Sequence, residues 1–288
     1  MSYEIIPILQ GSQEWLSLRK NKISATDTAV IMGLNPWKTP LMLWEEKLGL
    51  REPTQLTDKM KEGSLMEEQA RNFLNEKCSW NFKPAVIVSK IYPFMMASLD
   101  GMDEKRNKIV EIKCGLKSHE QALKGEIPEY YYAQCQKQLF IFGSDDNSYF
   151  SFRDENDNYC MTVRRDDAFI EKMIEAEKAF YSNMMDFTPP HATDKDFVER
   201  TDVDWFDACD NYSHAKHMRE KYEEEENEHR KVLIRLADGQ SCQGAGIRVS
   251  KGLRKGNVDY GRIEILKDVN LDDYRKPATQ FYRISENG

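Results

Sequence analysis

The sequence lacks the marks of membrane-spanning, secreted and zinc-knuckle proteins. No apolar run approaches the roughly 18 residues that a membrane span requires, and no signal peptide opens the chain. The six cysteines never come closer than about twenty residues to one another, so the chain has no CxxC pair and no metal-knuckle spacing. We therefore expect a soluble cytoplasmic protein whose thiols are reduced and mostly buried.

The chain also lacks the basic excess of proteins that coat nucleic acid without specificity, because its formal net charge is −8. The charge is unevenly distributed. Residues 187–228 hold 5 Lys and Arg against 13 Asp and Glu, whereas residues 229–288 hold 12 against 7. The C-terminal part is therefore expected to be a basic module behind an acidic connector.

A length of 288 residues allows one sizeable core with an appendage. We predict a core domain over residues 1–188, an acidic linker and helix over 189–228, and a small, basic, β-rich extension over 229–288. A long charged helix is expected at 205–237. Short strands are expected beyond it, at 246–249, 260–265 and 279–284.

The core reads as an α/β domain in which helices flank a mixed sheet. Ser12 is expected to cap a first helix, and Ser24 with Asp27 has capping-box spacing at the start of a second. Periodicity predicts further helices and strands, with a loop containing Gly115 and Gly125 between two of them. The predicted helices are 41–49, 60–78, 128–142 and 166–186, and the predicted strands are 84–92, 94–100, 108–114, 148–153 and 159–163.

Two charged residues, Glu111 and Lys113, interrupt the otherwise apolar third strand of this pattern. Residues i and i+2 of a strand share a face, so these two side chains project together. A hairpin would bring Asp100, at the end of the preceding strand, close to them. On this interpretation only one face of the strand is packed, and the other borders a cleft.

Two carboxylates beside open water positions suit Mg²⁺ or Mn²⁺, and a neighbouring lysine can orient a water for attack on phosphorus. The bland alternative is a solvated strand carrying an ordinary Glu–Lys pair, which contributes little to stability. The segment from Glu111 to Lys113 does not by itself exclude that alternative, so the surrounding sequence is needed to distinguish the two interpretations.

Four sequence blocks, in order along residues 13–143, distinguish the two interpretations and favour the metal site. "SLDGMDEKRNKIVEIKCG" resembles the PD-(D/E)xK nuclease motif, and Leu99 stands where the motif's name has proline. Together the blocks resemble the lambda-type and YqaJ-type phage recombination exonucleases, which implies a restriction-endonuclease-like core. The other three blocks are "WLSLRKNKISATD", "EGSLMEEQAR" and "YYYAQCQKQLFIFG".

The resemblance implies roles for individual residues. Asp100 would bridge two metal ions, and Glu111 with the carbonyl of Ile112 would bind the metal on the nucleophile side. Lys113 would position the attacking water, and Glu67 would be a helix-borne outer ligand. Glu67 can also be read as a surface glutamate beside its acidic neighbour.

A second set of residues would contact the substrate. By the resemblance, Arg19 with Ser24 and Thr26 would hold a terminal 5′ phosphate, which suits a guanidinium and a helix N-terminus. Gln134 would hydrogen-bond near the water or the scissile phosphate, with Gln138 one turn later. The alternatives are a helix cap and surface charge for the first group, and a wet helix edge for the glutamines.

Three consecutive tyrosines, Tyr130, Tyr131 and Tyr132, can stack on bases, but three neighbours on one helix cannot all face DNA. Core packing is the expected role of at least one of them.

The implied activity is a Mg²⁺-dependent (or Mn²⁺-dependent) two-metal exodeoxyribonuclease acting 5′ to 3′ on double-stranded DNA ends. It would serve a phage single-strand annealing protein in the cytoplasm of a bacterial host, as a homo-oligomer that the resemblance makes a trimer. One alternative is a Cas4-like or RecB-like end-processing nuclease, which the scattered cysteines disfavour for Cas4. Another is a non-catalytic DNA-binding or partner-binding module with a nuclease fold. The basic tail would contact DNA or the annealing partner, or simply shield the core.

Overall fold

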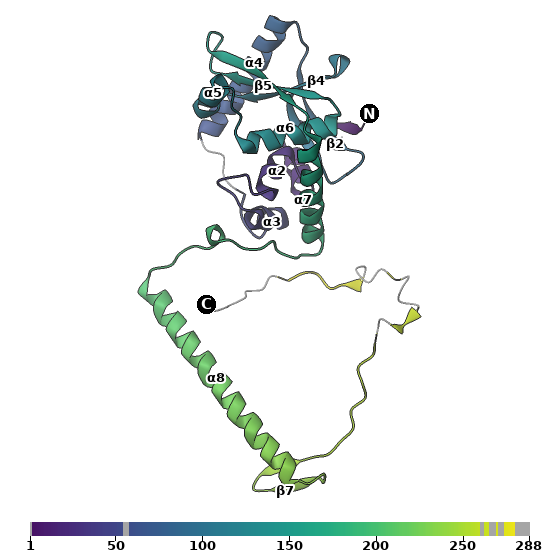
Figure 1. The fold of residues 1–288 in the computed structure, drawn as a ribbon, viewed down its shortest axis with the longest axis vertical. Helices are drawn as coiled ribbons and strands as arrows, with labels where there is room; N and C mark the ends of the chain where they lie inside the picture. Colours follow the sequence, from purple (N-terminus) through teal and green to yellow (C-terminus); the bar gives the residue numbers. More distant parts are fainter. Residues whose placement is uncertain (1, 54–57, 260–261, 265–268, 270–273, 280–288) are drawn as a thin grey trace. The chain divides into compact units, whose positions relative to one another are not determined.

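The computed structural model describes residues 2–53, 58–259, 262–264, 269 and 274–279 (Figure 1), with the side chains of 58–62 and 64 excepted. The chain divides into two compact units, Met1–Phe197 and Val198–Gly288.

Unit 1 is built on a six-stranded mixed sheet, which confirms the predicted fold class. Every neighbouring pair is antiparallel except β4 and β5, which are parallel. The strands lie side by side in chain order: β1 (Tyr3–Ile6), β2 (Lys83–Ser89), β3 (Met96–Asp103), β4 (Lys108–Lys113), β5 (Asp146–Phe152) and β6 (Asn158–Arg164).

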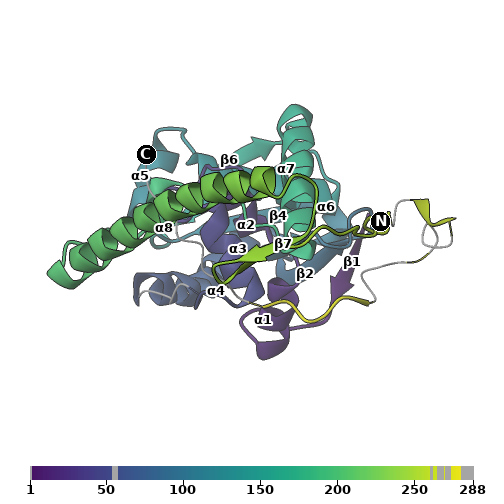
Figure 2. The same ribbon diagram turned by 90° about the horizontal axis from the view of Figure 1, so that it is seen from below.

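Helices cover both faces of this sheet. The long helix α4 lies over one face, and α6, packed against α2 and α7, lies over the other (Figures 1 and 2). The helices of unit 1 are α1 (Gln13–Lys20), α2 (Ala25–Ile31), α3 (Pro40–Leu48), α4 (Asp58–Cys78), α5 (Leu116–Leu123), α6 (Glu129–Phe142) and α7 (Asp167–Met185).

The predicted helix ends are confirmed where side chains or glycine fix them. The Ser12 hydroxyl accepts a hydrogen bond from the Trp15 N–H at 3.2 Å, and the Ser24 N–H donates to the Asp27 carboxylate at 2.8 Å. Gly143 ends α6 in the left-handed conformation, at a φ of 85°. Local capping chemistry therefore places α1, α2 and α6 correctly.

In unit 1, one strand and one α-helix were not predicted. β1 pairs along the edge of the sheet with β2, but a four-residue strand carries too short a pattern to be recognised. The loop prediction at Gly115 to Gly125 is wrong, because α5 forms there. Ser118 and His119 are buried on its inner side, whereas Leu116 and Leu123 are exposed, so the apolar residues of this segment do not mark the face that packs.

The interpretation that β4 has only one packed face is also wrong. Val110 and Ile112 pack with Phe150 in the core layer under α4. Ile109 packs in the other core layer, with residues of α6, and Glu111 is fully buried. A carboxylate with no exposed surface must be satisfied by protein groups, and this requirement organises the site described below.

Unit 2 begins with the 34-residue helix α8 (Val203–Leu236), followed by a hairpin of β7 (Cys242–Gly244) and β8 (Ile247–Val249). The helix and the strand at 246–249 agree with the prediction. The expected strands at 260–265 and 279–284 lie mostly outside the described residues. The predicted boundary at 228/229 falls inside α8, and the assignment of functions to the parts stays a prediction.

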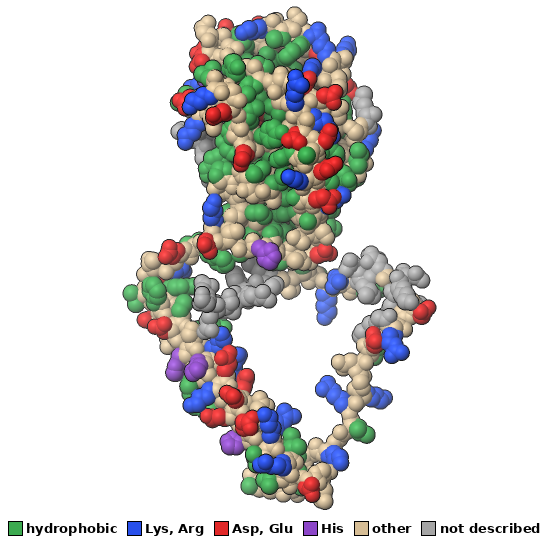
Figure 3. All heavy atoms as spheres, viewed as in Figure 1, with side chains coloured by type: hydrophobic (Ala, Val, Ile, Leu, Met, Phe, Trp, Pro, Cys, Tyr) green, Lys and Arg blue, Asp and Glu red, His purple; other side chains and the backbone are tan. Residues whose placement is uncertain are grey.

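The cysteines are all free, but the expectation that most are buried is wrong. Only Cys114 and Cys135 are buried, and the exposed ones are Cys78, Cys160, Cys209 and Cys242. Among the residues that the structure describes, no helix is long and apolar enough to cross a membrane. Acidic and basic side chains are interspersed on the face drawn in Figure 3, with no broad basic patch there.

Candidate active site

The predicted acids meet where β3 and β4 separate. The antiparallel ladder pairs Gly101 with Val110, and one step further along the Asp100 carboxylate accepts the Ile112 N–H at 2.7 Å. A Cβ at Gly101 would lie 2.6 Å from the Val110 side chain and 2.7 Å from the Phe82 Cβ. The glycine after Asp100 therefore allows the close strand approach that holds this carboxylate against β4.

Glu111 is the centre of the site. Its side chain accepts hydrogen bonds from Gln134 Nε2 at 2.6 Å and from Gln138 Nε2 at 2.5 Å. The Lys113 ammonium donates to the same carboxylate. Three donors on a fully buried carboxylate fix its position and offset its desolvation.

The two predicted glutamines differ in their surroundings. Gln134 keeps 8% exposure, whereas Gln138 keeps none, so Gln138 has no surface with which to contact DNA here. Its carbonyl oxygen accepts from Asn147 Nδ2 at 2.7 Å, which gives it the role of orienting Glu111. Gln136 points away from the site and donates to the Arg164 carbonyl.

Two residues of this cluster were not predicted. Asn147 of β5 supports Gln138, and Arg71 of α4 donates to the Asp100 carbonyl oxygen at 2.7 Å. The "EGSLMEEQAR" block contains Arg71, and its basic side chain one turn after Glu67 was a usable signal. Asn147 carries none, because only the parallel pairing of β4 with β5 brings it near.

Lys113 lies between the carboxylates and an aromatic ring. Its Nζ is 4.5 Å from the centre of the Tyr131 ring, and its side chain is 18% exposed. Burial alone would lower the pKa of Lys113, but the Glu111 and Asp100 carboxylates raise it well above its usual range. The ammonium is thus held as a cation beside an exposed edge of the site.

Burial, together with repulsion among the acids, shifts the pKa values of the carboxyl groups in this site. Burial raises the pKa of Asp100 well above its usual range, and the Glu111 and Glu67 carboxylates raise it further. Burial and Glu111 also raise the pKa of Glu67, although Lys113 opposes the shift. A divalent cation would relieve this repulsion, so the donor set fits a hard ion held by oxygen ligands.

Within the described residues, no three His, Cys, Asp or Glu side chains gather closely enough to form a ready metal cage. The three predicted carboxylate ligands, Glu67, Asp100 and Glu111, therefore do not form such a cage. The four-cysteine cluster of a Cas4-like protein finds no support in the same described part of the chain.

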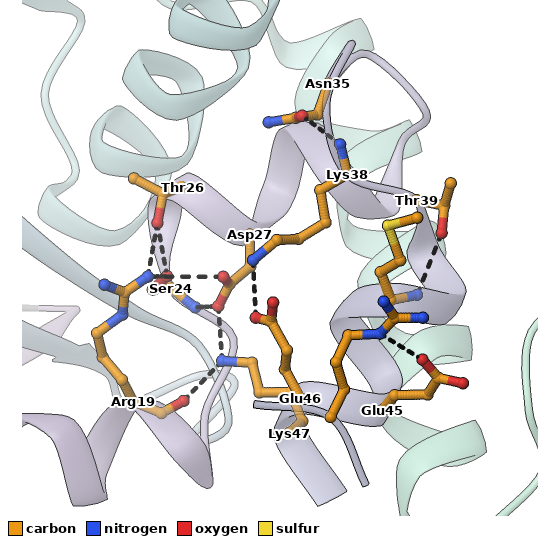
Figure 4. Close-up of polar contacts among 12 residues, drawn as sticks. Arg19, Ser24, Thr26, Asp27, Asn35, Lys38, Thr39, Glu45, Glu46 and Lys47 are labelled. Atoms are coloured by element: carbon orange, nitrogen blue, oxygen red, sulfur yellow. Dashed lines mark hydrogen bonds and ion pairs between the residues drawn. The ribbon is translucent and has the colours of Figure 1, made fainter. Parts of the chain in front are cut away.

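Arg19, Ser24 and Thr26 form a second polar cluster (Figure 4). An Arg19 Nη atom donates to the Thr26 hydroxyl at 2.9 Å and to the Ser24 hydroxyl at 3.2 Å. Ser24 is buried, Thr26 is exposed and the Arg19 side chain is 31% exposed. A guanidinium and a hydroxyl therefore face solvent together, which is the chemistry of an anion pocket.

A buried ion pair supports this pocket from behind. Lys47 of α3 donates to the Arg19 carbonyl at 2.6 Å, the Lys22 carbonyl at 2.7 Å and the Asp27 carboxylate at 2.7 Å. Burial alone would raise the pKa of Asp27, but Lys47 and Arg19 hold it well below its usual range. No spacing in the sequence marked Lys47, because its partners lie at least 20 residues away.

Replacing Lys47 with methionine is expected to lower the free energy of unfolding by about 3 kcal/mol, because Asp27 would keep a buried charge without its main partner. Urea denaturation measures this loss. Lys38→Met is the matched control on the neighbouring loop, where Lys38 pairs with Glu46 at 2.7 Å in a more exposed setting. Equal, small losses in both variants would contradict the supporting role of Lys47.

The three tyrosines of α6 have separate surroundings. The Tyr132 hydroxyl donates to Asp166 at 3.0 Å and its ring packs edge-on against Phe169, which gives it a structural role. Tyr131 lies beside Lys113, and the Tyr130 ring lies edge-on to Tyr131 at 4.4 Å between ring centroids. The expectation that at least one tyrosine packs is confirmed.

Comparison with known proteins shows which sequences part of the chain resembles. A model of the YqaJ-like viral recombinase domain matches residues 14–145. The uncharacterized protein YqaJ of Bacillus subtilis is 31% identical over 182 residues, which cover 59% of this chain and 55% of that protein. An uncharacterized protein of Acanthamoeba polyphaga mimivirus is 26% identical over 172 residues, covering 52% of this chain and 30% of that protein. The chain thus spans about half the length of the first relative and less of the second.

Solved structures give the fold. The alkaline exonuclease LHK-Exo of Laribacter hongkongensis superposes with a TM-score of 0.54 at 22% identity, covering 62% of this chain and 94% of that chain. Its complex with dAMP gives a TM-score of 0.55 over the same shares. The fold of unit 1 is therefore one that a known exonuclease uses.

Proposed function

We propose that this protein, whose residues 14–145 match the model of the YqaJ-like viral recombinase domain, is a metal-dependent 5′-to-3′ exonuclease of double-stranded DNA ends. The observation that carries the proposal is the convergence of Asp100, Glu111 and Lys113 beneath Gln134. In an ordinary surface ion pair, Glu111 would not be completely buried and would not accept hydrogen bonds from two glutamines.

In the proposed site, Asp100 and Glu111 hold Mg²⁺ or Mn²⁺, with the Ile112 carbonyl and Glu67 as further ligands. Two ions are proposed. When bound, such ions supply charge neutralisation at the phosphate and a more acidic bound water.

The chain's own groups do the positioning. Lys113 donates toward the attacking water from the exposed edge of the site, and Gln134 keeps Glu111 oriented while its remaining exposure lets it reach the water or the scissile phosphate. Gln138 and Asn147 lock Glu111 from the buried side. A fixed constellation of this kind lowers the barrier by orientation and by preorganised charge.

Arg19, Ser24 and Thr26 are proposed to hold the 5′-terminal phosphate. Charge-assisted hydrogen bonds from a guanidinium to a phosphate are stronger than neutral ones, and Lys47 with Asp27 fixes the backbone that carries Arg19. We further propose that the enzyme works as a homotrimer, supplies single strand to a phage annealing protein, and acts in the cytoplasm of a bacterial host.

Digestion of linear duplexes tests this function. Duplexes with a 5′ phosphate are expected to be degraded at least about tenfold faster than those with a 5′ hydroxyl, since a charge-assisted contact contributes roughly 1.5–3 kcal/mol. Labels placed at each end in turn report the direction, and the release of 5′ label first is expected. Activity should need Mg²⁺ or Mn²⁺ and stop with a chelator.

The matched variant for the pocket is Arg19→Gln, which should remove the preference for the 5′ phosphate while Thr26→Ser keeps it. Equal digestion of both ends by the unaltered protein, or release of the 3′ label first, would refute the proposed direction and pocket.

A further inference from the structure

A row of three aromatic rings runs from the surface to the ammonium of Lys113. Trp37, in the loop between α2 and α3, lies edge-on to Tyr130 with ring centroids 5.1 Å apart. Tyr130 lies edge-on to Tyr131 at 4.4 Å, and Tyr131 is the ring beside Lys113 Nζ. The outermost ring is thus three short contacts from a predicted catalytic group.

The outermost ring of the row is the exposed one. Tyr130 and Tyr131 are both half-buried, and Tyr131 packs against the core layer beneath α6, whereas Trp37 is 71% exposed. Hydrophobic stabilisation scales with the apolar area removed from water. Because the indole of Trp37 stays mostly in solvent, its contact with Tyr130 contributes little to the stability of the fold. A large aromatic face left in solvent beside a reactive site is instead typical of a contact surface.

The backbone that carries Trp37 is held in place before any ligand arrives. The Asn35 side-chain oxygen accepts the N–H groups of Trp37 and Lys38, each at 2.9 Å (Figure 4 labels Asn35 and Lys38). The Lys38 ammonium is tied to Glu46 at 2.7 Å. Ordering of this loop therefore costs little on binding, which favours recognition by the exposed ring.

We propose that Trp37 and Tyr130 form a stacking platform for a terminal or unpaired base of the DNA strand being cut. The inference rests on the proposed nuclease function and names a substrate contact for that site. An exposed ring can stack only on a base face that no neighbouring base covers, so paired bases inside a duplex do not qualify. Because every base has such a face, the contact tolerates any sequence.

The distances limit which bases can reach the platform. Along the row, the Trp37 ring centre lies no more than about 14 Å from Lys113 Nζ, and stacked nucleotides rise about 3.4 Å each. The contacted base therefore lies within about four nucleotides of the phosphate beside Lys113. A frayed or freshly unpaired end offers a free base at that distance.

Fluorescence of 2-aminopurine tests the platform. The probe duplexes carry a 5′ phosphate and one 2-aminopurine among the first four nucleotides of the 5′-ended strand. They are titrated with protein in a buffer that contains Ca²⁺ in place of Mg²⁺, so that binding is measured without hydrolysis. The unaltered protein should quench the probe at one or two positions. Trp37→Ala should abolish that quenching and weaken binding about tenfold, whereas Trp37→Phe should retain most of both.

Tyr130→Ala should behave like Trp37→Ala, and Trp205→Ala, which removes a 47% exposed tryptophan of α8, should match the unaltered protein. Unchanged quenching and affinity in Trp37→Ala would overturn the platform. Such a result alongside Mg²⁺-dependent digestion would leave the nuclease function standing. Quenching that depends on Trp37 without any digestion would support the platform and refute the nuclease. Absence of binding by the unaltered protein would refute the platform.

Discussion

Replacement of Lys113 with alanine is expected to slow DNA hydrolysis by about 10³-fold, within the range that loss of one positioned proton donor or charge stabiliser causes. Lys113 donates to the Glu111 carboxylate from a side chain that is still 18% exposed. No other cation within the described residues forms an ion pair with Glu111. The rate constant at saturating DNA should fall, with little change in DNA affinity.

The matched control is Lys108→Ala on the same strand. Lys108 pairs with Asp146 at 2.5 Å in a half-buried ion pair at the other end of β4, and its loss should change the rate less than twofold. Lys113→Arg keeps the charge but replaces a compact ammonium with a planar guanidinium, so it should recover only part of the rate. Rates are measured well below the melting temperature of each variant, because Glu111 loses a buried partner.

Activity of Lys113→Ala within a few-fold of the unaltered protein would remove this lysine from the mechanism. The contact between Lys113 and Glu111 would then be only a structural ion pair. The two glutamines of α6 would provide most of the stabilisation of the buried Glu111 carboxylate. A fall in DNA affinity with an unchanged saturating rate would also contradict the proposed role.

The parts of this site that could be predicted are those with local chemical spacing. Glu111 and Lys113 are two residues apart on one strand, and Asp100 precedes a short turn, so strand geometry alone brings them together. Arg19 and Thr26 fall within one helix–turn–helix segment, and their hydrogen bond at 2.9 Å agrees with the predicted grouping.

The parts that could not be predicted depend on contacts between distant segments. Asn147 reaches the site only through the parallel pairing of β5 with β4. Lys47 and Lys137 read as ordinary charges on amphipathic helices, and nothing local indicates that either is buried. The burial of Glu111 itself was missed because a strand with polar side chains on one face normally borders water there.

The ion pair of Lys137 with Glu177 carries the second large expected effect, on stability. Both side chains are 0% exposed, and the Thr28 hydroxyl donates to Glu177 at 2.7 Å, so the pair joins α2, α6 and α7. Lys137→Met is expected to lower the free energy of unfolding by about 3–5 kcal/mol, because Glu177 would remain as a buried charge without its cation. Urea denaturation measures the loss.

Two further variants isolate the ion pair. The double variant Lys137→Met, Glu177→Gln should recover most of the loss, since glutamine still accepts from Thr28 and carries no charge. Lys178→Ala breaks an exposed pair with Glu175 on the same helix, at 3.1 Å, and should leave the free energy of unfolding almost unchanged.

The stability loss in Lys137→Met is expected to depend on pH, in a direction set by the pKa of Glu177. Burial raises the pKa of Glu177 above its usual range, although Lys137 and the Thr28 hydroxyl oppose the shift. Removal of Lys137 takes away the larger opposing influence, so this pKa should rise further in Lys137→Met. A carboxyl whose pKa is higher in the folded than in the unfolded state stabilises the fold below its unfolded pKa, and this stabilisation is lost as pH rises through the folded pKa.

The stability deficit of Lys137→Met should therefore be smaller at about pH 5 than at about pH 8, whereas the double variant should show no such difference. A deficit below about 1 kcal/mol would show that α6 does not depend on this pair, and a larger deficit that is equal at both pH values would show that the unpaired charge of Glu177 is not its cause. Because α6 also carries Gln134 and Gln138, a loosened helix should reduce nuclease activity in Lys137→Met more at about pH 8 than at about pH 5, relative to the unaltered protein at the same pH.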